Sequence, residues 1–318
     1  MQPMRFVSLV GFLALSAGLV HATDISGTIS STLVITKNSQ LIGNATCTVT
    51  GSPCIQFGAP NIKLSLNGHV LTGKGSALQC LSVASGEDGI DTNFQNGVMI
   101  AGPGLIRRFR DAGILITGNN IGVDHVSVVD SCEEGIRVLG HGNHVENNSV
   151  VRSALAGGLL AGILCGGTGG HSIQRNEVIA SGVGGLILVA APQGGPIAGG
   201  SGILIYSNGN VIDTNDVSGN SGFGIGVNSS VPAGINNSLA PNPAAATGNV
   251  ISNNSVIGNF VVALGNPIRD TLTGTDFIDG SLPGSNTYIN NACEGSFGAG
   301  APVCPNLPAV SGHATPVN

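Results

Sequence analysis

Residues 113–120 read Gly-Ile-Leu-Ile-Thr-Gly-Asn-Asn, and residues 135–143 repeat the pattern as Gly-Ile-Arg-Val-Leu-Gly-His-Gly-Asn. A third copy, Gly-Ile-Leu-Ile-Tyr-Ser-Asn-Gly-Asn, occupies residues 202–210. The interval from Gly113 to Gly135 recurs between Gly202 and a shorter copy that begins at Gly224. Alternating aliphatic residues of this kind are typical of short β-strands with one buried face. The repeat therefore predicts a solenoid of similar coils.

A second repeat follows the Gly-Ile strands and consists of an aliphatic residue, two variable residues, Asn, one variable residue and Val. Its asparagines are Asn148, Asn176, Asn215 and Asn254, and Val126 takes the Asn position in an earlier copy. A circuit of about 22 residues, at roughly 3.3 Å per residue, is about 70 Å long and suits three short strands with their turns. We expect stacked coils with parallel strands, in which Ile114 points inward, Leu115 points outward and the asparagines form a hydrogen-bonded column.

The composition excludes several classes of protein. Glycine contributes 51 of 318 residues, charged residues only 9%, and the net charge is −6. An average domain has about 25% charged residues. A nucleic-acid-binding protein needs a basic surface that these few cations do not provide. A hydrophobic content of 42% with so little charge excludes a disordered chain, and the absence of a three-residue glycine period excludes collagen.

Residues 1–22 have the pattern of a secretory signal peptide. Arg5 is the only charge ahead of an apolar run over residues 6–20, and small or apolar residues precede the expected cleavage site after Ala22. The run is shorter than the roughly 20 residues that cross a bilayer as a helix. We therefore predict a secreted or periplasmic mature chain that starts near Thr23 and has no membrane span. An N-terminal membrane anchor is the alternative.

All seven cysteines lie beyond this segment, where export makes disulfides possible. Cys47 with Cys54 and Cys293 with Cys304 are close in sequence, and each pair brackets a Gly/Pro turn near one end of the chain. We predict a disulfide in each pair. Cys165 lies in an apolar strand pattern and is predicted to be a small buried hydrophobic residue. Spacing alone does not establish the connectivity or the unpaired cysteine.

These features resemble the right-handed parallel β-helix proteins of the pectate-lyase-like superfamily. The resemblance rests on the Gly-Ile strands, the Asn column and the opening segment over residues 61–73, and it covers roughly residues 55–292. It implies an all-β fold, a right-handed parallel β-helix with coils of about 22 residues that stack on one another. The expected organisation is an N-terminal cap with the first strands over residues 23–60, the β-helix over residues 61–292 and a disulfide-stapled tail over residues 293–318.

Two segments rich in Gly and Pro, residues 190–200 and 229–247, interrupt the regular repeat. They are predicted to be loops that leave the coil. Loops on a rigid scaffold often hold functional residues, but tolerated insertion explains such segments as well.

The resemblance implies that lyases of this fold place carboxylates, often with bound Ca²⁺, and an Arg or Lys base on the outward face of one sheet. Asp111 and Glu133 are separated by one repeat interval and are expected to lie one coil above the other, with Arg137 pointing outward nearby. Two such carboxylates repel unless a cation lies between them or one is protonated. We predict that Asp111, Glu133 and Arg137 are catalytic, with Asp111 and Glu133 as calcium ligands. An ordinary surface ladder of compensating charges is the alternative.

Other polar residues receive simpler interpretations. Asp130 and Arg152 are separated by the same interval and predict an ion pair between coils, which Arg108 would extend into a column. His141 is interpreted as a turn residue. The histidines at positions 125, 141, 144 and 171 do not have the spacing of a metal site.

Two classes of function remain open. The first is a secreted β-helix protein that interacts with an extracellular polysaccharide, either as a lyase-like enzyme or by binding alone. The second is a non-catalytic structural or adhesive surface protein. The acidic net charge weakens the first class for an anionic substrate, and the scarcity of Trp and Tyr weakens sugar stacking. The predicted partner is a polysaccharide, not a nucleic acid, and Ca²⁺ is the cofactor considered.

Overall fold

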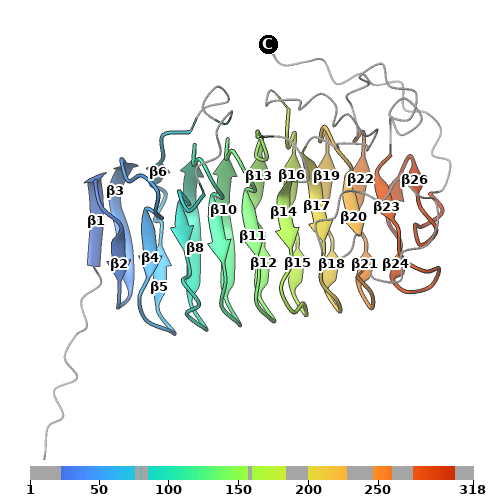
Figure 1. The fold of residues 1–318 in the computed structure, drawn as a ribbon, viewed down its shortest axis with the longest axis horizontal. Helices are drawn as coiled ribbons and strands as arrows, with labels where there is room; N and C mark the ends of the chain where they lie inside the picture. The colour runs from blue at the N-terminus through green and yellow to red at the C-terminus, as the bar shows by residue number, and fades with distance from the viewer. Residues whose placement is uncertain are drawn as a thin grey trace, which may run out of the picture.

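The computed structural model describes residues 23–75, 80, 85–156, 160–183, 200–227, 246–259 and 275–304. The regular elements in these ranges are all β-strands, and they coil into an elongated stack that runs from β1 to β26 (Figure 1). The described residues include no helix that is long and apolar enough to cross a membrane. The predicted signal peptide lies outside the described residues, as do almost all of the two predicted loops.

One side of the stack is a ten-stranded parallel sheet, which we call sheet B. Its strands in order are β2 (Leu33–Ile35), β4 (Ile55–Phe57), β7 (Ile90–Asp91), β9 (Ile114–Ile116), β11 (Ile136–Val138), β14 (Ala161–Cys165), β17 (Ser201–Ile205), β20 (Ile225–Val227), β23 (Phe277–Asp279) and β26 (Ser296–Phe297). Most are three residues long, too short to be stable except by pairing with the coils above and below.

The other sides are formed by a sixteen-stranded sheet, which we call sheet A. Its strands are β1 (Thr23–Ile29), β3 (Ser39–Cys47), β5 (Lys63–Ser65), β6 (Val70–Thr72), β8 (Met99–Arg107), β10 (Gly122–Val129), β12 (His144–Glu146), β13 (Ser149–Val151), β15 (Ser172–Gln174), β16 (Glu177–Ile179), β18 (Val211–Asp213), β19 (Asp216–Ser218), β21 (Val250–Ser252), β22 (Ser255–Ile257), β24 (Thr287–Ile289) and β25 (Ala292–Cys293). From β12 onward each coil contributes two of these strands, and β12 and β13 pair with the first and second halves of β10. Each such coil therefore has three short strands.

The right-handed parallel β-helix predicted from the sequence is confirmed. Its coil length is not uniform. Ile114 pairs with Ile136 and Ile203 pairs with Ile225, in both cases at the interval of the sequence repeat. Ile136 instead pairs with Ile163, so this coil contains more residues than the repeat interval. The described sheets also begin at β1, so the first strands already belong to the β-helix.

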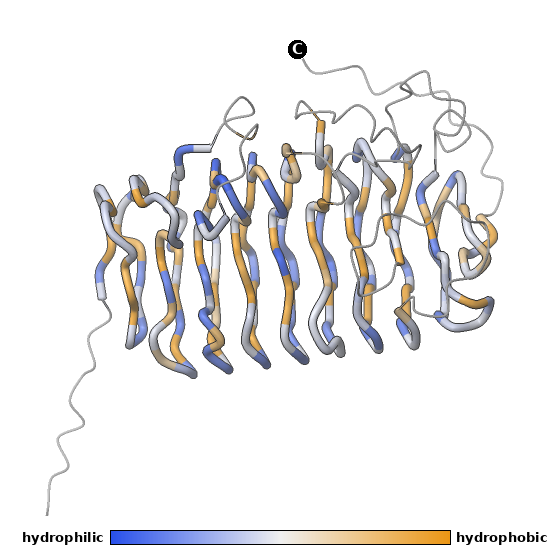
Figure 2. Tube along the Cα trace, viewed as in Figure 1, coloured by the Kyte–Doolittle hydropathy of each residue, from blue (hydrophilic) through white to orange (hydrophobic). Residues whose placement is uncertain are grey.

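Close packing explains why Gly precedes Ile in the repeated motif. A Cβ atom added at Gly135 would lie 2.3 Å from Val150 Cγ1 and 2.8 Å from the carbonyl oxygen of Gly162. Ile136 next to it is fully buried, as Ile114 is one coil earlier, whereas Leu115 and Arg137 are partly exposed. Hydrophobic residues recur along every coil in the same way (Figure 2). The predicted inward and outward orientations are confirmed.

Buried asparagines join the coils along the turns, as predicted. Nδ2 of each residue donates to Oδ1 of the next at 2.9–3.0 Å along the series Asn148, Asn176, Asn215, Asn254 and Asn291. The column begins at Val126, whose backbone N–H donates to Oδ1 of Asn148. The backbone alone makes the contact to the next coil, so a side-chain amide is not required at this position. Two further columns run through Asn210, Asn249 and Asn286 and through Asn220, Asn259 and Asp276.

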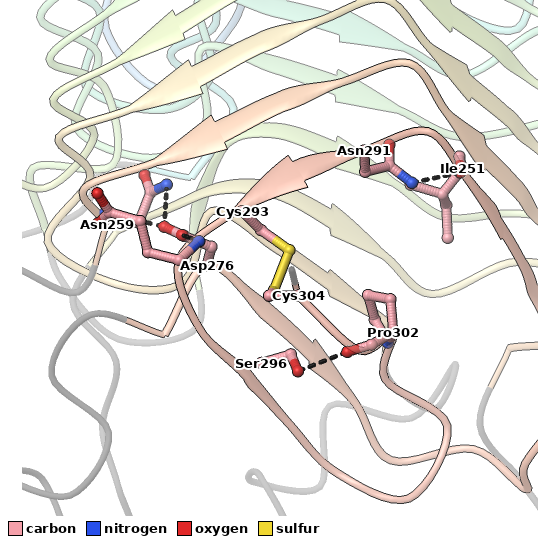
Figure 3. The surroundings of a disulfide bond; sticks show 9 residues. Ile251, Asn259, Asp276, Asn291, Cys293, Ser296, Pro302 and Cys304 are labelled. Carbon is pink, nitrogen blue, oxygen red and sulfur yellow. Dashed lines mark hydrogen bonds between the residues drawn. A yellow bond between two sulfur atoms is a disulfide. The ribbon is translucent and has the colours of Figure 1, made fainter. Parts of the chain in front are cut away.

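Both predicted disulfides are present. Cys47 bonds to Cys54, and Cys293 bonds to Cys304 beside the last coil, where Asn259 also donates to Asp276 (Figure 3). A third disulfide, whose pairing the sequence left open, joins Cys80 to Cys132. Cys165 is the unpaired cysteine, and burial raises the pKa of its thiol to about 12. Three disulfides fit a chain that folds in an oxidising compartment.

Candidate active site

Acidic residues precede successive strands of sheet B. Asp111 lies three residues before β9, and Glu133 and Glu134 come shortly before β11. Ile114 and Ile136 are paired in register, so the turns in front of them stack one above the other. Because the glycine at the end of each turn packs against the neighbouring coil, the acidic side chains are held at one edge of sheet B.

Arg137 brings the acidic residues together. It is the central, outward-facing residue of β11, the green strand in the middle of the stack in Figure 1. Its Nη2 lies 3.1 Å from Oδ1 of Asp111 and also donates to Oε2 of Glu133, and its Nε donates to Oε2 of Glu134 at 2.8 Å. The three residues singled out from the sequence therefore converge, together with Glu134.

Burial changes the proton affinities in this cluster. The Glu133 side chain is 19% exposed, whereas those of Asp111 and Glu134 are nearly inaccessible. Burial, followed by its contact with Asp111, raises the pKa of Glu133 to about 7. Burial also raises the pKa of Glu134. Burial alone would lower the pKa of Arg137, but the surrounding carboxylates raise it above its ordinary value, so the guanidinium stays charged.

Asp88 is a buried acid of the same edge that the sequence analysis missed. Its Oδ1 accepts a hydrogen bond from the backbone N–H of Ala112 at 3.1 Å, and burial, followed by the charge of Asp111, raises its pKa to about 8. It lines a small, open depression together with Lys74 and Arg110. The stretch Glu-Asp-Gly-Ile over residues 87–90 matches Glu-Glu-Gly-Ile over residues 133–136, and this similarity could have identified Asp88.

The neighbouring arginines make separate contacts. Arg110 pairs with Glu87 at 3.4 Å, and Nε of Arg107 donates to Oγ1 of Thr72. Arg152 forms the predicted ion pair with Asp130, with Nε 2.9 Å from Oδ1. Within the described ranges, no ion pair joins Asp130 to Arg108, although the two residues occupy stacked turn positions.

The cluster does not have the donor set of a calcium site. Ca²⁺ takes six to eight oxygen ligands. Here the guanidinium of Arg137 lies between the carboxyl groups of Asp111 and Glu133, which were the predicted ligands, and it hydrogen-bonds to both. The part of the chain that the structure describes holds no group of three or more His, Cys, Asp or Glu residues that could bind a metal ion. The positive charge that this pair of carboxylates requires is therefore supplied by Arg137.

His141 and His171 lie in the turns that follow β11 and β14, whereas His125 lies within β10 and His144 is the first residue of β12. His141 forms a bridge to Asn119, as expected of a turn residue. His171 takes an asparagine position in the second column, where its Nδ1 accepts from the backbone N–H of Asn143 and its Nε2 contacts the carbonyl oxygen of Gly166 at 2.9 Å. Burial lowers the pKa of His171, so its imidazole stays neutral. It acts as a structural member of the column.

No protein-family model matches the sequence, and no curated protein matches it significantly. Similar solved structures include the pectate lyase Pel9A, at TM-score 0.48 and 10% identity over 82% of this chain and 70% of the lyase. The enzymatically active domain of bacteriophage CBA120 tailspike protein 2 has TM-score 0.48 and 15% identity over 82% of this chain, which spans only 42% of that domain. A mutant of the periplasmic alginate epimerase AlgG has TM-score 0.46 and 11% identity over 86% of this chain and 73% of the epimerase. Identities this low concern overall architecture and do not assign a reaction.

Proposed function

We propose that this protein is an exported β-helix that binds an extracellular polysaccharide on the outer surface of sheet B, and that it cleaves uronate units there by a lyase-like reaction. The observation that supports the proposal is the arrangement around Arg137. A half-buried guanidinium holds several carboxyl groups, of which Glu133 is the most exposed and has a pKa of about 7. Groups with pKa values close to the working pH make efficient proton-transfer catalysts.

The resemblance implies an Arg or Lys base, but the raised pKa of Arg137 makes that role unfavourable for this residue. We assign the base to Glu133, which is ionised above about pH 7. In the proposed step the C5–H bond of a uronate breaks and its proton passes to Glu133. The electron pair forms the C4–C5 double bond as the C4–O bond breaks, and water protonates the leaving oxygen. Arg137 offsets the negative charge that develops on the uronate carboxyl group.

Asp111 and Glu134 act on Arg137. They accept its hydrogen bonds from the buried side and fix the orientation of the guanidinium. The second oxygen of Asp111 accepts from the backbone N–H of Gly86 at 2.6 Å, which anchors the carboxylate to the preceding coil. Both are positioning residues.

The experiment measures the release of unsaturated uronates from polygalacturonate, alginate and glycosaminoglycans by ultraviolet absorbance. We expect activity with one polyuronate, a rate that rises as pH increases through about 7 while Glu133 loses its proton, and a loss of at least 100-fold in Glu133→Gln. Glu146→Gln is the matched control, because Glu146 also pairs with an arginine, Arg175, but on sheet A. No absorbance change with any of these polymers would rule out the reaction.

A non-catalytic structural or adhesive role is the second candidate. The observation that favours it is that the carboxyl groups of Asp111, Glu133 and Glu134 already occupy Arg137. In that case the wild-type protein releases no unsaturated product, and Glu133→Gln changes only stability.

A further inference from the structure

The turn after β7 holds an aromatic residue in a conformation that suits glycine. The backbone N–H of Gln95 donates to the carbonyl oxygen of Thr92 at 2.9 Å, which closes a four-residue turn. The two central residues, Asn93 and Phe94, have φ values of 47° and 58°. Positive φ at both positions is the mark of a type I′ turn, which prefers Asn followed by Gly. Phenylalanine at the second position is strained because its Cβ crowds the backbone.

Contacts to neighbouring coils hold the turn in place. The backbone N–H of Phe94 donates to Oγ1 of Thr117 at 2.8 Å, and the backbone N–H of Asn93 donates to Oδ1 of Asp91 at 2.7 Å. Nδ2 of Asn93 also reaches the carbonyl oxygen of Phe57 at 3.3 Å. The strained residue is thus fixed by the coils before and after it. Strain of this kind persists only where the surroundings enforce it, and it concentrates at functional sites.

The same turn presents the aromatic ring to solvent. The connection from Ile90 to Met99 is longer than its counterpart from Ile114 to Gly122 in the next coil, although both join paired strands. Phe94 is 75% exposed. Among the described phenylalanines only Phe297 is also exposed, at 37%, and the others are buried. Because the Phe94 ring is largely exposed, burial of the ring does not offset the strain of the positive φ at this residue.

The turn lies on the same side of the molecule as the carboxyl cluster. Asp91 in β7 is in register with Leu115, and Leu115 is in register with Arg137. Two coil spacings separate Asp91 from Arg137, about 10 Å. Phe94 follows Asp91 by three residues, at the opposite edge of sheet B from the acidic turns. A polymer that crosses the outside of sheet B can therefore contact Phe94 and Arg137 at once, whereas a single sugar cannot.

We propose that Phe94 is a substrate-binding residue that stacks against a sugar ring of the polysaccharide, several sugars away from Glu133. The inference rests on the proposed function and specifies a distal subsite for it. An aromatic ring offers a flat apolar face to the C–H face of a pyranose. A backbone that already holds the residue in place lowers the entropic cost of binding. The subsite acts on binding and not on the proton transfer.

The test compares Phe94→Gly with the wild-type protein by calorimetric titration with oligomers of polygalacturonate and alginate. Both proteins carry Glu133→Gln so that turnover does not consume the ligand. We expect about 3- to 10-fold weaker binding. We also expect a melting temperature about 2 °C higher, because glycine accepts positive φ without strain. Phe94→Tyr retains binding, and Phe297→Ala, the matched exposed-aromatic control, leaves binding unchanged.

The outcomes separate the subsite from the function on which it rests. If the wild-type protein binds and cleaves a polyuronate and Phe94→Gly binds it equally well, the subsite is overturned and the proposed function stands. Weaker binding together with a lower melting temperature would show that Phe94 is structural and overturn the subsite. If the protein without the Phe94 change binds none of the oligomers, both the function and the subsite fail.

Discussion

The buried cluster at Arg137 and the exposed pair of Asp130 and Arg152 arise from the same sequence spacing. One repeat interval separates Asp111 from Glu133, and the same interval separates Asp130 from Arg152. In the exposed pair the arginine side chain is 54% exposed, against 21% for Arg137. Spacing in a β-helix thus determines which residues lie on adjacent coils, whereas burial determines their chemistry.

The difference follows from the part of the coil that each set occupies. Asp130 and Arg152 directly follow strands of sheet A, at turn positions with φ of 60° and 49°. The Arg152 side chain projects from there into solvent, where ion pairs are screened. The cluster lies farther along the same connection, where the chain turns tightly into sheet B, and its carboxyl groups lose most of their hydration.

The largest expected effect comes from removing the shared cation. Arg137→Met leaves the carboxyl groups of Asp111, Glu133 and Glu134 buried without their partner, so we expect a loss of about 3–5 kcal/mol in the free energy of unfolding at pH 8. The matched control is Arg152→Met, with an expected loss of about 1 kcal/mol or less. Urea denaturation measures both. Equal losses in the two variants would contradict the distinction between the buried and exposed sets.

A second prediction concerns Asp88. Its pKa in the folded protein is about 8, above the ordinary value of 3.8. Between about pH 4 and about pH 8 the carboxyl group is therefore protonated in the folded state and ionised in the unfolded state. The free energy of unfolding therefore falls as pH rises from about 4 to about 8. Asp88→Asn removes this ionisation, so the variant should match the wild type at pH 4 and exceed it at pH 8, by up to about 5 kcal/mol.

Urea denaturation at a series of pH values measures this difference. Glu133 contributes a slope of the same sign, because its pKa is also raised, so the variant keeps part of the pH dependence. Asp130→Asn serves as the control carboxyl group. A variant that is no more stable than the wild type at pH 8 would show that Asp88 is ionised in the folded protein.

The sequence predicted the coil, the strand orientations, the Asn column and two disulfides because each repeats or lies close along the chain. It also placed Asp111, Glu133 and Arg137 together, since a constant spacing holds between β9 and β11. The repeat interval did not identify Asp88, because the coil from Ile90 to Ile114 is longer than that interval. Asp88 and Asp111 are therefore not separated by the interval that separates Asp111 from Glu133. The side-chain conformation of Arg137, which engages the predicted calcium ligands, depends on burial that spacing does not encode.

The smallest predicted effect belongs to the exposed pair and depends on salt. Asp130→Asn should lower the free energy of unfolding by no more than about 0.5 kcal/mol in roughly 0.05 M NaCl, because the Arg152 side chain is 54% exposed and its ion pair with Asp130 is open to solvent on that side. In 1 M NaCl, where the screening length is about 3 Å, the difference should vanish. The loss in Arg137→Met should persist in 1 M NaCl, since mobile ions do not enter the buried cluster. If high salt removes both losses, the carboxyl groups around Arg137 are solvated and cannot have the raised pKa values on which the proposed proton transfer depends.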